Sequence, residues 1–311
     1  MAAHVLLRPD VHDRVHDRAH DVPQVSSEPE APGTADEPST LPAEQGPGGG
    51  PPSPMNALPG GAAFGTLVHE VLEEVDPTAD DLPAELLDRC RSAVVHRLAG
   101  VDPAALATAL LPVLHTPLGA DGLRLADIGP ADRLAELDFE LPLSGGDVPT
   151  AGQGQLRELA GLLRRHLPAD DPLAPYADLV DAVDAPPLRG YLSGSIDAVL
   201  RLPGPRYVVV DYKTNRLGAG DLTALHYTRE AMAAEMLRAH YVLQALLYAV
   251  ALHRYLRWRQ PGYDPQQHLG GVQYLFVRGM VGPGTPDGCG VFDWQPPVQL
   301  VLDLSDLLAG S

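Results

Sequence analysis

The stretch GYLSGSIDAVLRLPGPRYVVVDYKTN, residues 190–215, contains the features that decide the fold. Two apolar runs, 189–202 and 206–213, flank a Pro-Gly-Pro turn sequence, and this order predicts a β-hairpin. Each run carries a carboxylate late in its strand, Asp197 in the first and Asp211 in the second. The hairpin therefore predicts two acidic side chains on adjacent strands.

Lys213 is the only lysine among the 22 basic residues of the chain. Lysine is a compact point charge whose pKa shifts readily, whereas arginine is a planar fork that is always charged. Side chains alternate along a strand, so the Asp211 carboxylate and the Lys213 ammonium lie on one face. Two poorly solvated carboxylates, Asp197 and Asp211, would repel unless a cation lay between them. Mg²⁺ prefers such oxygen ligands beside phosphates, which indicates a metal-dependent phosphodiesterase.

Length and composition allow one large domain or two small ones, since 45% of the 311 residues are hydrophobic. No run reaches the roughly 18 apolar residues of a membrane span, and the N-terminus lacks the apolar core of a signal peptide. Cys90 and Cys289 make no CxxC pair, which argues against an iron–sulfur cluster or a zinc site. We therefore expect a cytoplasmic protein with no membrane partner.

The net charge of −19 argues against a broad nucleic-acid footprint. The charge is unevenly distributed, however, because Pro186 to Gln260 contains ten Lys and Arg against five Asp and Glu. This segment carries +5, so the rest of the chain carries −24. The basic segment is the one that holds Lys213, although a solvated arginine face is the plainer interpretation of any single arginine.

Residues 1–58 are predicted to be a disordered leader or tether, because their composition cannot bury enough apolar area to offset the entropy of ordering. Residues 59–311 are predicted to form one domain. Apolar periodicity predicts helices over 62–75, 83–98, 103–116, 153–166, 173–183 and 228–259, the last broken near His240. Strands are predicted over 133–142, 189–202, 206–213, 270–279 and 298–302, with a glycine- and proline-containing loop at 282–297. This order predicts an α/β fold, a mixed sheet flanked by helices.

Six segments match one family in order and cover most of 60–282. They are GTLVHEVLE (65–73), AELDF (135–139), GYLSGSIDAV (190–199), VVVDYKTNRLG (208–218), HYVLQALLYAVALHRYLRWR (240–259) and GGVQYLFVRGM (270–280). The set resembles the PD-(D/E)XK nucleases, and more narrowly the C-terminal nuclease domain of RecB, the helicase–nuclease subunit of exonuclease V. The Asp-Tyr-Lys triplet alone is weak, whereas the ordered set followed by a Gln-x-x-x-Tyr helix is highly specific. The resemblance implies a restriction-endonuclease-like core.

The resemblance also implies roles for individual residues. The implied catalytic residues are Asp197, Asp211 and Lys213. The implied ligands of one or two Mg²⁺ ions are His69, Glu136, Asp197, Asp211 and the backbone carbonyl of Tyr212, with Glu140 open as the alternative to Glu136. Tyr241, Gln244 and Tyr248 match a helix motif that contacts DNA or orders the site.

Each of these residues also has an ordinary structural explanation. His69 could be a boundary residue of an amphipathic helix, Glu136 a strand-face charge, and Asp197 the partner of an arginine. The two tyrosines and the glutamine of the helix motif recur at i, i+3 and i+7, which ordinary packing also produces. The run His-Glu-Val-Leu-Glu does not match the His-Glu-x-x-His signature of zinc proteases.

The implied function is Mg²⁺-dependent hydrolysis of DNA, as an exonuclease or endonuclease on single strands, in RecBCD-type double-strand-break repair and recombination. A Walker loop requires a lysine, and the only lysine follows Asp211-Tyr212, so no ATP site is expected. The expected partners are DNA together with RecC-like and RecD-like subunits or a separate helicase. The chain is either a separately encoded module or a piece of a longer protein, and alone it is expected to act weakly and unprocessively.

Two other functions fit parts of the sequence. A freestanding single-strand exonuclease of the same superfamily would carry an iron–sulfur cluster on four cysteines, which two distant cysteines do not supply. A catalytically silent module that docks on helicase–nuclease partners or holds DNA would be marked by loss of the acids or the lysine. None of these residues is lost here.

Overall fold

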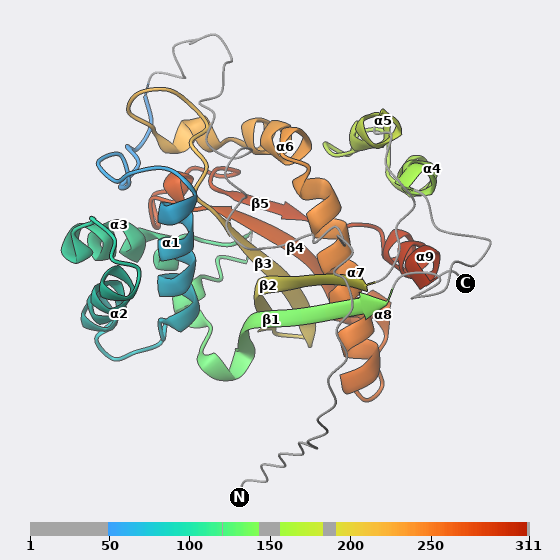
Figure 1. Cartoon of the computed structure of the whole chain (residues 1–311), viewed down its shortest axis with the longest axis horizontal. Coiled ribbons are helices and arrows are strands. Elements are labelled where there is room, and N and C mark those ends of the chain that lie inside the picture. The colour runs from blue at the N-terminus through green and yellow to red at the C-terminus, as the bar shows by residue number, and fades with distance from the viewer. Residues whose placement is uncertain (1–48, 120, 143–155, 183–190, 310–311) are drawn as a thin grey trace, which may run out of the picture.

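A mixed five-stranded sheet forms the centre of the protein (Figure 1). This computed structural model describes residues 49–119, 121–142, 156–182 and 191–309, so the predicted disorder of 1–48 lies outside the described residues. The strands follow the order β1 (Arg133–Pro142), β2 (Tyr191–Leu202), β3 (Arg206–Lys213), β4 (Leu269–Phe276) and β5 (Val291–Trp294). Only the β3–β4 pair is parallel among these described strands. The predicted mixed sheet, including the hairpin, is confirmed.

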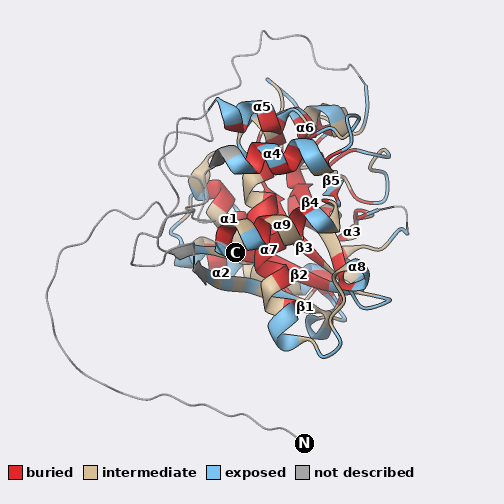
Figure 2. Ribbon diagram, turned by 90° about the vertical axis from the view of Figure 1, so that its right-hand side faces the viewer, coloured by how far each residue is buried: buried red, intermediate tan, exposed pale blue. Residues whose placement is uncertain are grey.

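Helices cover both faces of the sheet, as predicted for this class. One face packs against α1 (Ala62–Glu74), α2 (Leu82–His96) and α3 (Pro103–His115). The other packs against α4 (Leu156–His166), α5 (Tyr176–Asp181), α6 (Arg229–Arg238), α7 (Tyr241–Arg259) and α9 (Val298–Ala309), and the short helix α8 (Pro265–His268) precedes β4. Buried residues follow the sheet and the inner faces of these helices (Figure 2). Neighbouring residues of β3 point into different cores, because Val209 packs on the α7 side and Val210 on the α1 side.

The long helical region is broken where the sequence predicts. His240 adopts a left-handed backbone (φ 56°) between α6 and α7. Helix α7 then begins at Tyr241 and runs for 19 residues, most of them buried against the sheet. Its first turns, which carry Tyr241 and Gln244, therefore lie beside the end of β3. Among the described helices, none combines the length and the apolarity that crossing a bilayer requires.

The C-terminal elements differ from the prediction. Residues 298–302 begin α9 and do not form a strand. Buried residues of α9 fall at 300, 301, 304, 305 and 308, which is a helical spacing. A window of only five residues cannot distinguish this spacing from that of a strand. Strand β5 lies within the predicted loop 282–297, and 277–279 form a 3₁₀ turn after β4.

The packed chain starts earlier than the predicted boundary at residue 59. The Met55 side chain is completely buried, and the backbone amide of Ser53 donates to the carbonyl of Leu222 at 2.8 Å. The guanidinium of Arg278, also completely buried, donates to the carbonyl of Thr214 (2.8 Å) and to that of Met55 (2.9 Å), and it also donates to the carbonyl of Pro59. Proline-rich composition hid this segment, because its anchors are few: the buried side chains of Met55 and Leu58, and hydrogen bonds that include those between Asn56 and the backbone of Leu222.

Candidate active site

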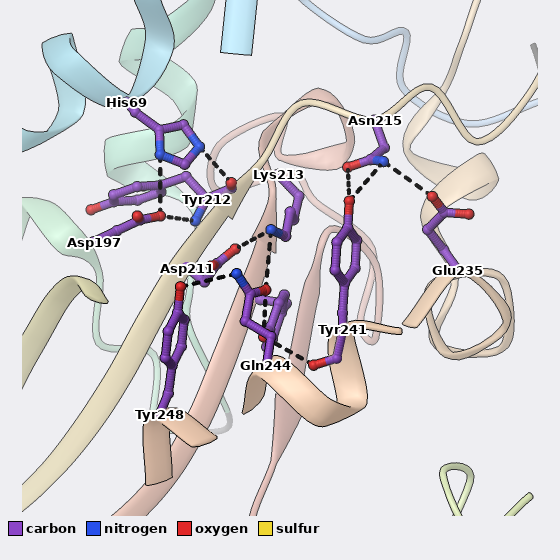
Figure 3. Close-up of polar contacts among 11 residues, drawn as sticks. His69, Asp197, Asp211, Tyr212, Lys213, Asn215, Glu235, Tyr241, Gln244 and Tyr248 are labelled. Carbon is purple, nitrogen blue, oxygen red and sulfur yellow. Dashed lines mark hydrogen bonds and ion pairs between the residues drawn. The ribbon is translucent and has the colours of Figure 1, made fainter. Parts of the chain in front are cut away.

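The site begins where strands β2 and β3 stop pairing. Their backbone ladder ends at the pair Ala198 and Val210. Beyond it, a carboxylate oxygen of Asp197 accepts the backbone N–H of Tyr212 at 2.8 Å (Figure 3). Asp197 thereby satisfies a strand donor that has lost its ladder partner, which keeps its carboxylate buried at the end of the hairpin.

His69, on helix α1, contacts the same end of the β2–β3 hairpin. Its Nε2 donates to the carbonyl oxygen of Tyr212 at 2.7 Å, and its Nδ1 lies 3.3 Å from Oδ2 of Asp197 (Figure 3). Burial alone would lower the pKa of His69. Attraction to Asp197, the hydrogen bond to it and attraction to Asp211 together outweigh burial and raise that pKa to about 9. Burial alone would raise the pKa of Asp197, which attraction and hydrogen bonding from His69 hold below its usual value.

Glu73, which the sequence analysis did not select, completes a cluster of ligand type with these two residues. One ligand atom each of His69, Glu73 and Asp197 lies within 4.8 Å of the others. Glu73 is half-buried and makes no hydrogen bond or ion pair with any residue that the structure describes. Burial, and then repulsion from Asp197, raise its pKa to about 7. The available indication was the spacing, since residues four apart share a helix face.

Glu136 and Glu140 lie outside this cluster. Glu136 lies between Ala135 and Leu137, which pair with Ala198 and Ile196 of β2. It has a left-handed backbone (φ 52°) and exposes its side chain. Glu140 pairs with Ser193 farther along β1 and is also exposed. The structure therefore brings Glu73, and not either predicted glutamate, together with His69 and Asp197.

Asp211 and Lys213 form a buried ion pair on the α7 side of β3. Lys213 Nζ lies 2.9 Å from Oδ2 of Asp211, and the two side chains are 10% and 2% exposed. Burial raises the pKa of Asp211. The attraction of Lys213 lowers it and repulsion from Asp197 raises it, so that the pKa lies at about 6. Burial alone would lower the pKa of Lys213, but Asp211 raises it above its usual value, so the amine stays an ammonium.

The predicted helix motif lies directly over this lysine. Gln244 Oε1 accepts from Lys213 Nζ at 3.3 Å and from the Tyr274 hydroxyl at 3.0 Å. Gln244 Nε2 donates to the Tyr248 hydroxyl at 2.9 Å (Figure 3). The Tyr241 ring centroid lies 4.0 Å from Nζ. The ammonium is therefore held by an acceptor, a carboxylate and an aromatic face, which leaves it little freedom to move.

Asn215 is a second residue that the sequence analysis did not select. Its Nδ2 donates to the Tyr241 hydroxyl at 3.2 Å and to Oε1 of Glu235 at 3.0 Å. The Tyr227 hydroxyl donates to its carbonyl at 2.8 Å. Asn215 fixes the ring that covers Lys213, and its position two residues after the lysine, inside the matched segment 208–218, was the available indication.

Comparison with known proteins identifies this arrangement. A family model described as the PD-(D/E)XK nuclease superfamily matches residues 48–289. The chain belongs to the PD-(D/E)XK nuclease superfamily, and the predicted restriction-endonuclease-like fold is confirmed.

Its relatives carry one name. It is 56% identical over 298 residues to the "RecBCD enzyme subunit RecB" of Mycolicibacterium smegmatis, covering 91% of this chain and 27% of that protein. The RecB subunit of Mycobacterium tuberculosis (strain CDC 1551 / Oshkosh) is 54% identical with the same coverage. That of Escherichia coli (strain K12) is 33% identical over 256 residues, covering 81% of this chain and 20% of its own length. The chain thus spans about a quarter of the length of its more similar relatives.

Proposed function

We propose that this chain is a metal-dependent DNA nuclease that hydrolyses phosphodiester bonds in single strands, as an exonuclease or endonuclease. The observation that carries the proposal is the buried Asp211–Lys213 pair beside the cluster of His69, Glu73 and Asp197. These groups provide ligands for a hard cation and an ammonium in a fixed position. Phosphodiester hydrolysis requires both kinds of group.

The donor set fits a divalent cation. The site contains three carboxylates, those of Glu73, Asp197 and Asp211. The pKa values of Glu73 and Asp211 are raised by burial and by repulsion from Asp197. A cation between them would relieve that repulsion, and oxygen-rich sites favour Mg²⁺. We assign one or two Mg²⁺ ions to Asp197, Asp211, His69 and the Tyr212 carbonyl, and we add Glu73 in place of Glu136 or Glu140.

The mechanism follows from what the side chains can do. When bound at these residues, Mg²⁺ would lower the pKa of a water and offset the charge that develops on the phosphate. Asp211 keeps the proton on Lys213, and Gln244 fixes the direction of its ammonium. Lys213 therefore orients the attacking water and offsets negative charge on the scissile phosphate in the transition state. His69 holds the Tyr212 carbonyl in position through its Nε2 proton.

We assign the nuclease to double-strand-break repair and recombination, with DNA and either RecC-like and RecD-like subunits or a separate helicase as partners. The similarity to proteins named RecBCD enzyme subunit RecB supports this assignment. We place it in the cytoplasm, where the buried thiols of Cys90 and Cys289 would stay reduced.

The first test measures nicking of single-stranded DNA by the purified chain in Mg²⁺ and in EDTA, beside an Asp211→Ala variant. We expect cleavage only with the metal and the wild-type carboxylate, because Asp211 both binds the cation and holds Lys213. Cleavage that persists in EDTA would refute the metal requirement. Absence of cleavage in every condition would instead support the catalytically silent docking module.

A second prediction concerns Glu73 as a ligand. Replacement of Glu73 by glutamine should weaken Mg²⁺ binding by about tenfold or more, a typical loss at a metal site. Isothermal titration calorimetry would measure this affinity without any cleavage assay. Glu74→Gln is the matched control, because Glu74 is the exposed neighbour on the same helix. If both variants bind Mg²⁺ like the wild type, the ligand role of Glu73 is wrong and Glu136→Gln should be titrated next.

A further inference from the structure

A second surface of unusual composition lies at the far end of α7. The side chain of Trp258 is 75% exposed, and the guanidinium of Arg259 lies 4.6 Å from its ring centroid. Arg257 and Arg206 are also exposed. We call these four residues the Trp258 surface. Trp258 follows Gln244 by 14 residues, which is about 21 Å along the helix axis, so this surface is separate from the catalytic groups.

The start of β3 brings Arg206 to the same end of the molecule. The hydroxyl of Tyr207, the next residue, donates to Oε1 of Gln260, which ends α7, at 3.3 Å. Arg206 therefore lies at the same end of the molecule as Arg257, Trp258 and Arg259, all of which are exposed. Arginine stacked on an aromatic face keeps its N–H groups free for other acceptors.

The positive charge of this surface is not neutralised locally. Arg206, Arg257 and Arg259 make no hydrogen bond or ion pair with any residue that the structure describes. Other exposed arginines, such as Arg124 and Arg164, pair with carboxylates at 2.6 to 2.7 Å. The nearby carboxylate of Asp264 caps α8, where it accepts from the Gln266 amide and the Gln267 side chain. In a chain of charge −19, an unpaired cluster of this kind fits an anionic ligand.

We propose that the Trp258 surface binds a single strand of nucleic acid outside the catalytic site. A base stacks on the exposed indole, and backbone phosphates pair with the arginines on either side, a combination that tolerates any sequence. An acidic peptide would satisfy the arginines but would leave the indole without a planar partner. The proposal shares its ligand class with the proposed nuclease function, but it does not depend on the metal, on Asp211 or on Lys213.

The two tryptophans of the chain make the binding directly observable. Trp294 is 4% exposed and its indole N–H donates to Asp171 at 3.1 Å, so Trp258 is the indole that a ligand can reach. Oligothymidylate added in EDTA should quench the tryptophan fluorescence of the full chain. Trp258→Phe should remove the quenching, and Trp258→Ala should weaken binding, measured by anisotropy of a labelled oligothymidylate, by about tenfold.

The charge contribution has its own variants and control. The double variant Arg257→Gln/Arg259→Gln should weaken binding and lower the slope of log K against log salt by about 1.4, since two phosphate contacts are lost. The matched control is Arg91→Gln/Arg165→Gln, which removes one exposed arginine from α2 and one from α4. Neither arginine makes an ion pair with any residue that the structure describes. This control should bind the oligonucleotide like the wild type. All of these positions are exposed, so thermal melting should confirm that the variants fold.

Three results would overturn the proposal. The first is unchanged affinity in Trp258→Ala and in the double variant. The second is an equal loss of affinity in the Arg91 and Arg165 control. The third is quenching and competition by polyglutamate at the same charge concentration, which would indicate an acidic protein as the ligand. An Asp211→Asn variant should still show the quenching, so failure of the nuclease proposal and failure of this one are distinguishable.

Discussion

Replacement of Lys213 by arginine is expected to reduce the rate of DNA cleavage by about 100-fold or more, the usual contribution of one positioned proton-transfer or charge-stabilising group. The charge is unchanged, so the loss would come from geometry. The ammonium fits between Asp211 at 2.9 Å, Gln244 at 3.3 Å and the Tyr241 ring at 4.0 Å. A planar guanidinium is wider and donates in fixed directions, so it cannot occupy the same space.

Single-turnover cleavage of a labelled single strand would measure this effect, with Mg²⁺ affinity from calorimetry as a second readout. We expect the affinity to change by a few-fold at most, because the carboxylates and His69 remain. Arg165→Lys, an exchange between the same two residue types at an exposed position, is the control and should cleave normally. Cleavage by Lys213→Arg at a rate close to that of the wild type would rule out the proposed role of the ammonium.

Replacement of Arg278 by methionine is expected to lower the free energy of unfolding by roughly 3 kcal/mol or more. The guanidinium is completely buried, donates to the carbonyls of Thr214, Met55 and Pro59, and lies 5.0 Å from the Phe64 ring centroid. Methionine fills part of the space but leaves these carbonyls without their donor, and each buried unsatisfied group costs about 1–3 kcal/mol. For a protein of this size, such a loss corresponds to a fall in Tm of roughly 6–12 °C.

Differential scanning calorimetry and urea unfolding would measure this change. Arg91→Met serves as the control, since Arg91 is exposed on α2, and its effect should stay within about 0.5 kcal/mol. An Arg278→Met protein that melts within about 2 °C of the wild type would show that water or neighbouring donors replace the guanidinium.

The arrangement of acidic and basic residues on β3 was predictable because its information is local. Alternation along 206–213 places Asp211 and Lys213 on one face, and the turn before it brings Asp197 to the adjacent strand. The spacing of Tyr241, Gln244 and Tyr248 likewise fixes a shared helix face. The structure places these side chains beside one another as the pattern indicates, while their catalytic roles remain predictions.

The rest depends on contacts between distant segments. Glu73 shares a face with His69 in the sequence, but only the docking of α1 on the end of β2 brings it near Asp197. Nothing in the sequence around Arg278 indicates its structural role, because its acceptors at Met55 and Pro59 lie more than 200 positions earlier. The run 298–302 was assigned to the wrong element because a segment of five residues, four of them apolar, fits a strand as well as a helix.

The presence of only one lysine in the sequence has a spectroscopic consequence. In a sample grown with ¹⁵N-lysine, the whole chain contributes one backbone amide resonance of this type, and it comes from the end of β3. The methylene protons next to Nζ lie close to the Tyr241 ring, so the ring current should shift them away from the positions of an exposed lysine. One assigned pair of NMR signals would therefore follow the binding of a cation or a DNA strand at the candidate active site, with no need to assign the rest of the spectrum.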